Sequence, residues 1–207
     1  MKTKLLLIAG FIAVAGLSAS AQKMLEGDKK LSFLAGQTKI NIVYDYDGMM
    51  VGKKEEAEYL NEKKAKGNEK QPGKGDRWVE KWHNNKTSMY EPMFDELINK
   101  QLFKGKTNAT AVKGAADAKY TIIVKTVMLE PGFNSVVMKQ NPFCKYEITY
   151  IETATKTVMA KGLLTAQGVL MGGSDWDFDP ANGIKECFAK AGKVCGSSMA
   201  KAMKVKK

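Results

Sequence analysis

The sequence has few of the residues on which disulfide-rich scaffolds and many hydrolases depend. It contains three cysteines, five prolines and one histidine, His83, in 207 residues. Three cysteines are too few for a fold held together by disulfides. One histidine without a G-x-S-x-G motif gives little basis for a nucleophile and its base, and the lack of C-x-x-C spacing argues against zinc. We therefore expect no catalytic residues, no metal site and no cofactor.

Arginine is almost missing as well. Arg77 is the single arginine among 33 basic residues, against 22 acidic ones, and the net charge is +11. Proteins that read nucleic acids depend on arginine for bidentate contacts with bases and phosphates, so no nucleic-acid partner is predicted. The lysines are spread along the chain, with a dense cluster only in the tail of Lys204, Lys206 and Lys207. We favour a solvated surface over attraction to anionic envelope polymers or lipids, but both interpretations stay open.

The long hydrophobic run of this sequence lies at its N-terminus. Two lysines precede an apolar stretch at 5–17, and an A-x-A cleavage signal follows at 19–21. This pattern predicts a secretory signal peptide over residues 1–21, with cleavage before Gln22. No cysteine follows the cleavage site, so a lipoprotein is not expected. No later segment is apolar for long enough to be an integral membrane span, and the expected location is periplasmic or secreted.

Several segments show the alternation and β-branched composition that are typical of strands. The segment at 143–152 is the clearest, because it places four large or apolar residues on one face: Cys144, Tyr146, Ile148 and Tyr150. The predicted strands lie at 39–46, 119–129, 143–152 and 157–171, with a short additional strand at 134–139.

Helical periodicity appears in two places. Residues 76–103 predict two consecutive helices or one kinked helix, with Asp76 as the first N-cap and Ser88 and Glu91 at the spacing of a capping box. Pro92 then falls in the first turn of the second helical piece, where proline is least harmful.

The second helical region closes the chain. It is predicted to begin at Asp179 as N-cap, with Pro180 at the first helical position, and to continue to about residue 202. Gly192 and Gly196 are four residues apart, and we expect them to let this helix lie close to the sheet.

The stretch at 48–75 has a different composition. It combines charged helix formers at 52–66 with a Gly/Pro/Lys segment at 67–75 that is typical of a linker. We interpret 48–75 as a charged helical insertion on a single domain that spans residues 22–207.

The order of these elements predicts an α+β fold. The expected architecture is a single mixed or antiparallel sheet of four to five strands in the order β-α-β-β-β-α, with two main helices packed on it.

This order resembles that of the TolB N-terminal domain and of the LpoB-like periplasmic accessory proteins. The segments GDRWVEKW, YEPMFDELINKQL, VKTVMLEPGFN and AKAGKVCG are also similar to an uncharacterised secreted protein family common in Bacteroidota. The resemblance implies an envelope location. It implies no activity, and a cell-wall role would rest on analogy of fold.

The cysteines leave two interpretations open. In an oxidising compartment Cys144 can pair with Cys187 or with Cys195, whereas Cys187 and Cys195 lie too far apart along one helix to pair with each other. The alternative is three buried free thiols that act as small apolar side chains.

The segment 168–178 is the candidate docking loop. It places Met171, Trp176 and Phe178 in a glycine-flanked stretch without helical periodicity, and exposed aromatic side chains on such loops often anchor partners. The alternative is that these aromatic residues cap the end of the core. Carboxylates at alternate positions of 175–179 also resemble an EF-hand loop, but Pro180 occupies the position that needs a glycine.

The function that the sequence favours is that of an exported, non-catalytic envelope protein with an accessory, binding or scaffolding role. Its expected partner is an envelope protein or polymer. The alternative is a small envelope hydrolase that uses carboxylates, for example Glu130 with an aspartate of 175–179.

Overall fold

The computed structural model describes residues 21–134, 139–169 and 180–203, and its centre is one mixed sheet of eight strands. Six strands lie side by side in the order β1-β10-β9-β6-β2-β5, and β3 and β4 extend the sheet beside β6. The strands are β1 (Ala21–Gly27), β2 (Lys39–Asp45), β3 (Met50–Val51), β4 (Lys54–Glu55), β5 (Thr110–Lys113), β6 (Tyr120–Glu130), β9 (Phe143–Glu152) and β10 (Val158–Gln167). A separate small hairpin pairs β7 (Phe133–Asn134) with β8 (Lys139–Gln140).

The class is α+β, but the expectation of four to five strands is wrong. β5 is a four-residue edge strand, and β3 and β4 have two residues each. Strands this short carry too few residues to show a period of two. β1 is polar and lies across the expected cleavage site, so its sequence shows no strand pattern.

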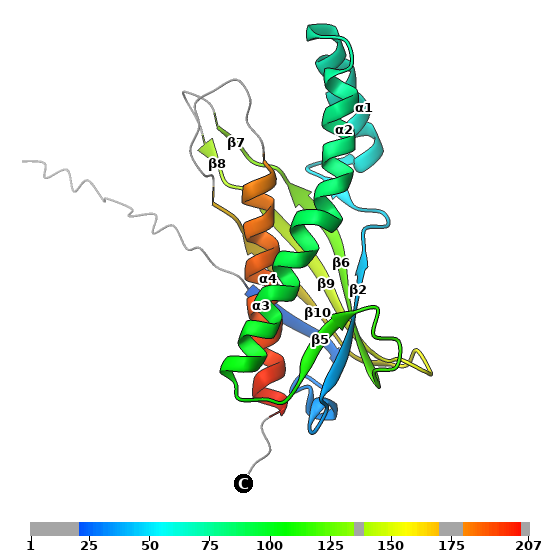
Figure 1. Ribbon diagram of the computed structural model, residues 1–207, viewed down its shortest axis with the longest axis vertical. Coiled ribbons are helices and arrows are strands. Elements are labelled where there is room, and N and C mark those ends of the chain that lie inside the picture. Colours follow the sequence, from blue (N-terminus) through cyan, green and yellow to red (C-terminus); the bar gives the residue numbers. More distant parts are fainter. Residues whose placement is uncertain (1–20, 135–138, 170–179, 204–207) are drawn as a thin grey trace, which may run out of the picture.

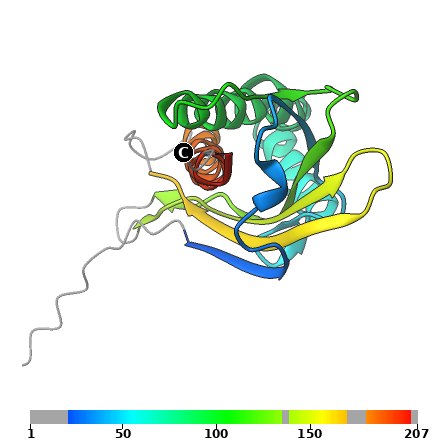
Figure 2. The same ribbon diagram turned by 90° about the horizontal axis from the view of Figure 1, so that it is seen from below.

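The helices are α1 (Glu56–Lys70), α2 (Lys74–Asn85), α3 (Glu91–Lys104) and α4 (Ala181–Met203), with a short 3₁₀ helix at Ser32–Leu34. A π-helical turn, Lys86–Tyr90, joins α2 to α3. These three pieces form one long rod that runs along the height of the molecule, and α1 folds back against its upper part (Figure 1). The sheet curls so that α4 lies between it and α3 (Figure 2).

The long predicted strands are confirmed, and their inward faces build the core. All four residues that the alternation of 143–152 placed on one face are fully buried in β9. From the opposite side α4 inserts Phe188, whose ring contacts Tyr146 edge-on at 5.2 Å and stacks on Tyr90 at 5.4 Å between ring centroids. Each such ring contributes roughly 1.5–3 kcal/mol by its burial.

Two glycines of α4 lie against α3, not against the sheet as expected. A Cβ atom added at Gly192 would lie 2.4 Å from the carbonyl oxygen of Phe94, and one added at Gly196 would lie 2.5 Å from that of Ile98. The two helix backbones therefore approach so closely that neither position has room for a side chain.

The region expected to be an insertion begins with residues of the core. Met49 and Val51 are both about 2% exposed, and β3 pairs in parallel with the end of β6. The expected linker at 67–75 is wrong in its greater part, because α1 continues to Lys70 and α2 begins at Lys74. For the rest of 48–75, the interpretation as an insertion predicts that it is dispensable for folding.

Within the described ranges, no helix has both the length and the apolar character that crossing a bilayer requires.

Candidate functional site

The predicted docking residues Met171, Trp176 and Phe178 lie outside the described residues, as do the carboxylates of 175–179. The two ends of that segment are anchored. Gly168 is buried, its N–H donates to the carbonyl of Pro142 at 2.8 Å, and Pro180 is buried at the start of α4. The docking role of this loop therefore stays a proposal.

The described part of the chain offers a different candidate surface, the α1–α2 arm, which we define as residues 56–85. The arm projects past the end of the sheet (Figure 1). Its two helices touch through glycines, since a Cβ atom on Gly67 would lie 2.6 Å from the Cα of Gly75. Asn68 receives a hydrogen bond from the Gly75 N–H and donates one to Asp76, both at 2.7 Å. The glycine-rich sequence thus forms a close helix crossing instead of a linker.

Aromatic rings fill the space between the two helices of the arm. Trp78 stacks on Trp82 with 5.4 Å between ring centroids, and Tyr59 of α1 lies 5.5 Å from Trp82. Trp82 is buried, whereas Tyr59 and Trp78 are half-buried. The ammonium group of Lys63 lies over both of these half-buried rings, at 5.5 and 5.8 Å. The two tryptophans, four residues apart, therefore lie on one face of α2, and this face packs against α1.

A small hollow opens at the base of this aromatic cluster. It is lined by Trp78, Lys81, Trp82, Asn85, Tyr90 and Pro180. It lies between the arm and the start of α4.

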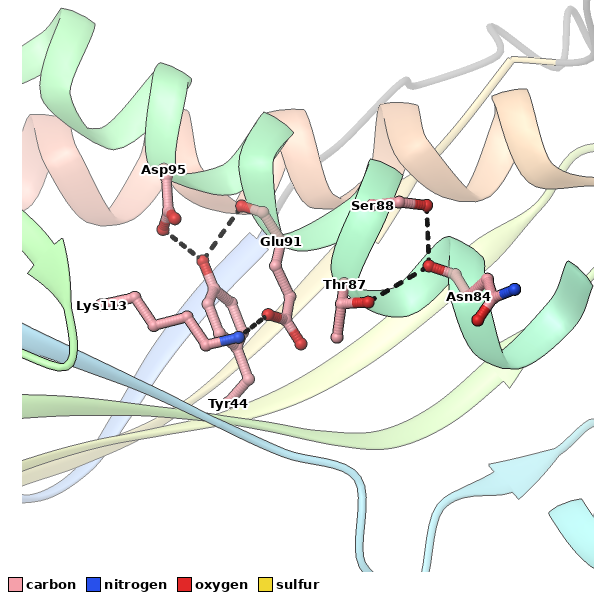
Figure 3. Close-up of polar contacts among 7 residues, drawn as sticks. All are labelled: Tyr44, Asn84, Thr87, Ser88, Glu91, Asp95 and Lys113. Carbon is pink, nitrogen blue, oxygen red and sulfur yellow. Dashed lines mark hydrogen bonds and ion pairs between the residues drawn. The ribbon is translucent and has the colours of Figure 1, made fainter.

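The joint between arm and body is the π-helical turn. The N–H of Glu91 donates to the carbonyl of Lys86, five residues back. The expected capping box is wrong, because the Ser88 hydroxyl donates instead to the carbonyl of Asn84 at 2.7 Å (Figure 3). The cause is Pro92, which has no N–H and whose ring would clash with the carbonyl four residues earlier in a regular helix. A wider turn just before the proline keeps the rod continuous.

A salt bridge crosses this joint. Lys86 pairs with Glu56 of α1 at 2.7 Å and lies 4.7 Å from the ring centroid of Tyr46, which follows β2. The other carboxylate contact of Glu56 is with the indole N–H of Trp82, at 2.6 Å. Lys86 and Glu56 therefore connect the arm to the end of the sheet.

A second polar cluster holds α3 to β2 and β5 (Figure 3). Tyr44 donates its hydroxyl to Asp95 at 2.5 Å and also approaches the carbonyl of Glu91 at 3.1 Å. Glu91 is only 4% exposed and is ion-paired with Lys113 of β5. Burial raises the pKa of Tyr44 far above its usual value of 10, and the neighbouring Asp95 carboxylate adds to this shift. Burial also raises the pKa of Asp95.

This cluster contains two carboxylates one helical turn apart, but each already has a partner. An acid and a base for hydrolysis would need to face a substrate in a cleft, whereas Glu91 and Asp95 face Tyr44 and Lys113. The arrangement therefore serves to dock α3 on the sheet.

The other residues singled out from the sequence stay apart from one another. His83 is exposed on α2. Glu130 accepts a hydrogen bond from the N–H of Gly132 at 3.3 Å, in the turn that follows β6. Among the described residues there is no group of three or more His, Cys, Asp or Glu side chains that could hold a metal ion.

The three cysteines are buried, and each is a free thiol. Cys144 of β9 contacts Cys187 of α4, and burial together with this contact raises the pKa of the Cys144 thiol. Burial raises the pKa of Cys195 to about 12.

The sequence analysis did not identify two ion pairs of these clusters, Lys86 with Glu56 and Lys113 with Glu91. The paired residues lie 30 and 22 residues apart in the chain, beyond the reach of any spacing rule within one helix. A weak signal was present, because Glu91 lies on the same face as the apolar stripe of α3, an unusual place for an unpaired carboxylate.

The chain matches no known protein-family profile and no curated protein. Two solved structures are weakly similar in fold. The PelC dodecamer from Paraburkholderia phytofirmans has a TM-score of 0.42 and 12% sequence identity, over 87% of this chain and 97% of that one. A variant PelC dodecamer from the same organism has a TM-score of 0.41 and 12% identity, over 87% and 98% of the two chains. A likeness at this level carries no argument about function.

Proposed function

We propose that this chain is an exported protein of the cell envelope, periplasmic or secreted, which acts by binding a partner and not by catalysis. Export is supported by the predicted signal peptide over residues 1–21. All strands of the sheet other than β1 lie wholly after the expected cleavage site, so cleavage before Gln22 would leave the core in the mature chain.

The observation that carries the binding role is the α1–α2 arm. Its helices are held by their own contacts, by the Gly67–Gly75 crossing and by the ion pair of Lys64 with Asp76 at 2.8 Å. Leu60 and Trp82 are its large buried side chains, and most of its other residues are exposed or half-buried. A projection that is held by its own contacts and exposes most of its residues is typical of a surface for contact with another molecule.

Two measurements test the two halves of this proposal. Intact mass of the exported protein should show a chain that starts at Gln22, and a membrane-bound product that retains Met1 would contradict export. For binding, the tagged protein is cross-linked in the envelope and compared with a variant whose arm is shortened by replacing residues 65–74 with a short Gly/Ser turn. Lys64 and Gly75 lie side by side, so this turn can close the hairpin. Capture of the same partners by both proteins would exclude the outer part of the arm as the binding surface.

A further inference from the structure

The tip of the arm concentrates positive charge that is dispersed in the sequence. We define the tip as residues 63–77. It contains six basic residues and two acidic ones, which are Lys63, Lys64, Lys66, Lys70, Lys74 and Arg77 against Glu69 and Asp76. The tip therefore contributes +4 to the net charge of +11. The hairpin brings the charges of both helices to one end of the molecule, remote from the sheet (Figure 1).

Part of this charge is not neutralised within the protein. Asp76 pairs with Lys64, but within the described part of the chain no ion pair involves Lys66, Lys70 or Arg77. Lys63 is affected by its neighbours in the tip. Partial burial and the charges of Lys66 and Lys70 lower the pKa of its ammonium group, against the opposing effect of the Glu62 carboxylate. The tip is thus a cluster of mutually repelling cations that an external anion would relieve.

The shape of the tip favours one kind of anion. A single phosphate or carboxylate group is normally held in a concave site with converging donors, and a polymer strand is held along a groove. The tip is instead the convex end of two helices joined by the three residues 71–73. A convex cationic end can bring several lysines at once against a flat array of negative charges.

We propose that the tip of the arm binds the anionic headgroups of a lipid membrane surface. The inference rests on the proposed export, which would bring the mature chain next to membranes. Lysines close to an anionic bilayer each strengthen attachment by about fivefold. Removing Lys66 and Lys70 is therefore expected to weaken attachment by about 25-fold, and added salt should weaken it further because the contact is exposed.

The test is co-sedimentation of the purified chain 22–207 with vesicles of phosphatidylcholine and phosphatidylglycerol, or of phosphatidylcholine alone. The tip variant carries Lys66→Gln and Lys70→Gln. The matched control carries Lys193→Gln and Lys201→Gln, which remove the same charge from exposed positions of α4. A third variant replaces Lys204, Lys206 and Lys207 by glutamine. Circular dichroism and urea unfolding show that each variant is folded.

The proposal predicts binding to the anionic vesicles only. This binding should be about 25-fold weaker in the tip variant and unchanged in both of the others. The proposal is overturned if the anionic vesicles are not bound, or if the α4 or tail variant loses as much affinity as the tip variant. Binding of soluble polyglutamate through the same lysines, without binding of vesicles, would identify a polymer site and also overturn it. Export is tested separately by the mass of the mature chain. A failure of the membrane-binding proposal can therefore be told from a failure of the proposed export.

Discussion

Alanine at Gly192 or Gly196 should destabilise the protein, although alanine is the better helix former. In an exposed helix the exchange of glycine for alanine gains about 1 kcal/mol. Here the new methyl group would lie 2.4 or 2.5 Å from a carbonyl oxygen of α3. An ordinary carbon contact begins near 3.4 Å, so α4 and α3 would have to separate by about 1 Å in a close-packed core.

The magnitude follows from setting these two effects against each other. Overpacking costs about 1–3 kcal/mol, and we take the upper end because a backbone oxygen cannot rotate away as a side chain can. After subtraction of the gain in helix propensity, each substitution should lower the free energy of unfolding by about 2 kcal/mol. For a chain of this size the melting temperature should fall by roughly 4–8 °C.

Urea unfolding followed by circular dichroism and tryptophan fluorescence measures this change. Lys193, the exposed neighbour on the same helix, provides the control. Lys193→Ala compared with Lys193→Gly gives the intrinsic preference of this helix for alanine, expected at about 1 kcal/mol. If Gly192→Ala stabilises the protein by that same amount, the close approach of α4 to α3 is refuted.

Three further predictions concern other parts of the chain. The free energy of unfolding should fall as the pH rises above 10, because the unfolded phenol of a shielded tyrosine ionises while the folded one stays neutral. Each such tyrosine should contribute about 1.4 kcal/mol per pH unit. Burial raises the pKa of five tyrosines, Tyr44, Tyr46, Tyr59, Tyr146 and Tyr150. Tyr150→Phe should reduce that pH dependence, and an unchanged alkaline titration of stability would contradict the assignment. Replacing residues 65–74 with a short turn should leave cooperative unfolding intact. The buried Met49 provides the contrast, because Met49→Ala should lower the free energy of unfolding by about 2–5 kcal/mol. Loss of folding in the shortened variant would show that the outer part of the arm is needed for the core. The three buried thiols should resist alkylation in the native protein and all react in denaturant without reductant. A single reactive thiol would instead reveal a disulfide of Cys144 with Cys187 or with Cys195.

The long elements were predictable because each carries its own periodicity. β6, β9 and β10, the two-part helix at 76–103 and the last helix all follow from repeated apolar positions that neighbouring residues reinforce. The sequence did not show which element each apolar face packs against. The close glycines of α4 were recognised as small, but the choice between the sheet and α3 depends on contacts between distant segments.

The arm shows the same limit at the level of the candidate site. The basic residues at 63–70 and at 74–77 look like a dispersed, solvated pattern along the chain, and the glycines at 67, 73 and 75 suggest a flexible link. Their clustering depends on the crossing of α1 and α2, which joins residues on either side of the turn, such as Asn68 and Asp76. The capping-box prediction failed for a related reason, since the continuous rod offers Ser88 a carbonyl acceptor that an isolated helix start would lack.

The edge strand β1, which comes first in the chain, affects the order in which the protein can fold. β1 pairs only with β10 in the described sheet, where Ala21 lies opposite Thr165, and the core is completed by α4, later still in the chain. Contacts between such distant segments slow folding, because loop closure must precede the gain from packing. A chain that emerges from a translocation channel N-terminus first would therefore hold β1 unpaired until most of the protein had crossed. In an exported chain the pairing of β1 with β10 and the packing of α4 would thus become available only late in translocation.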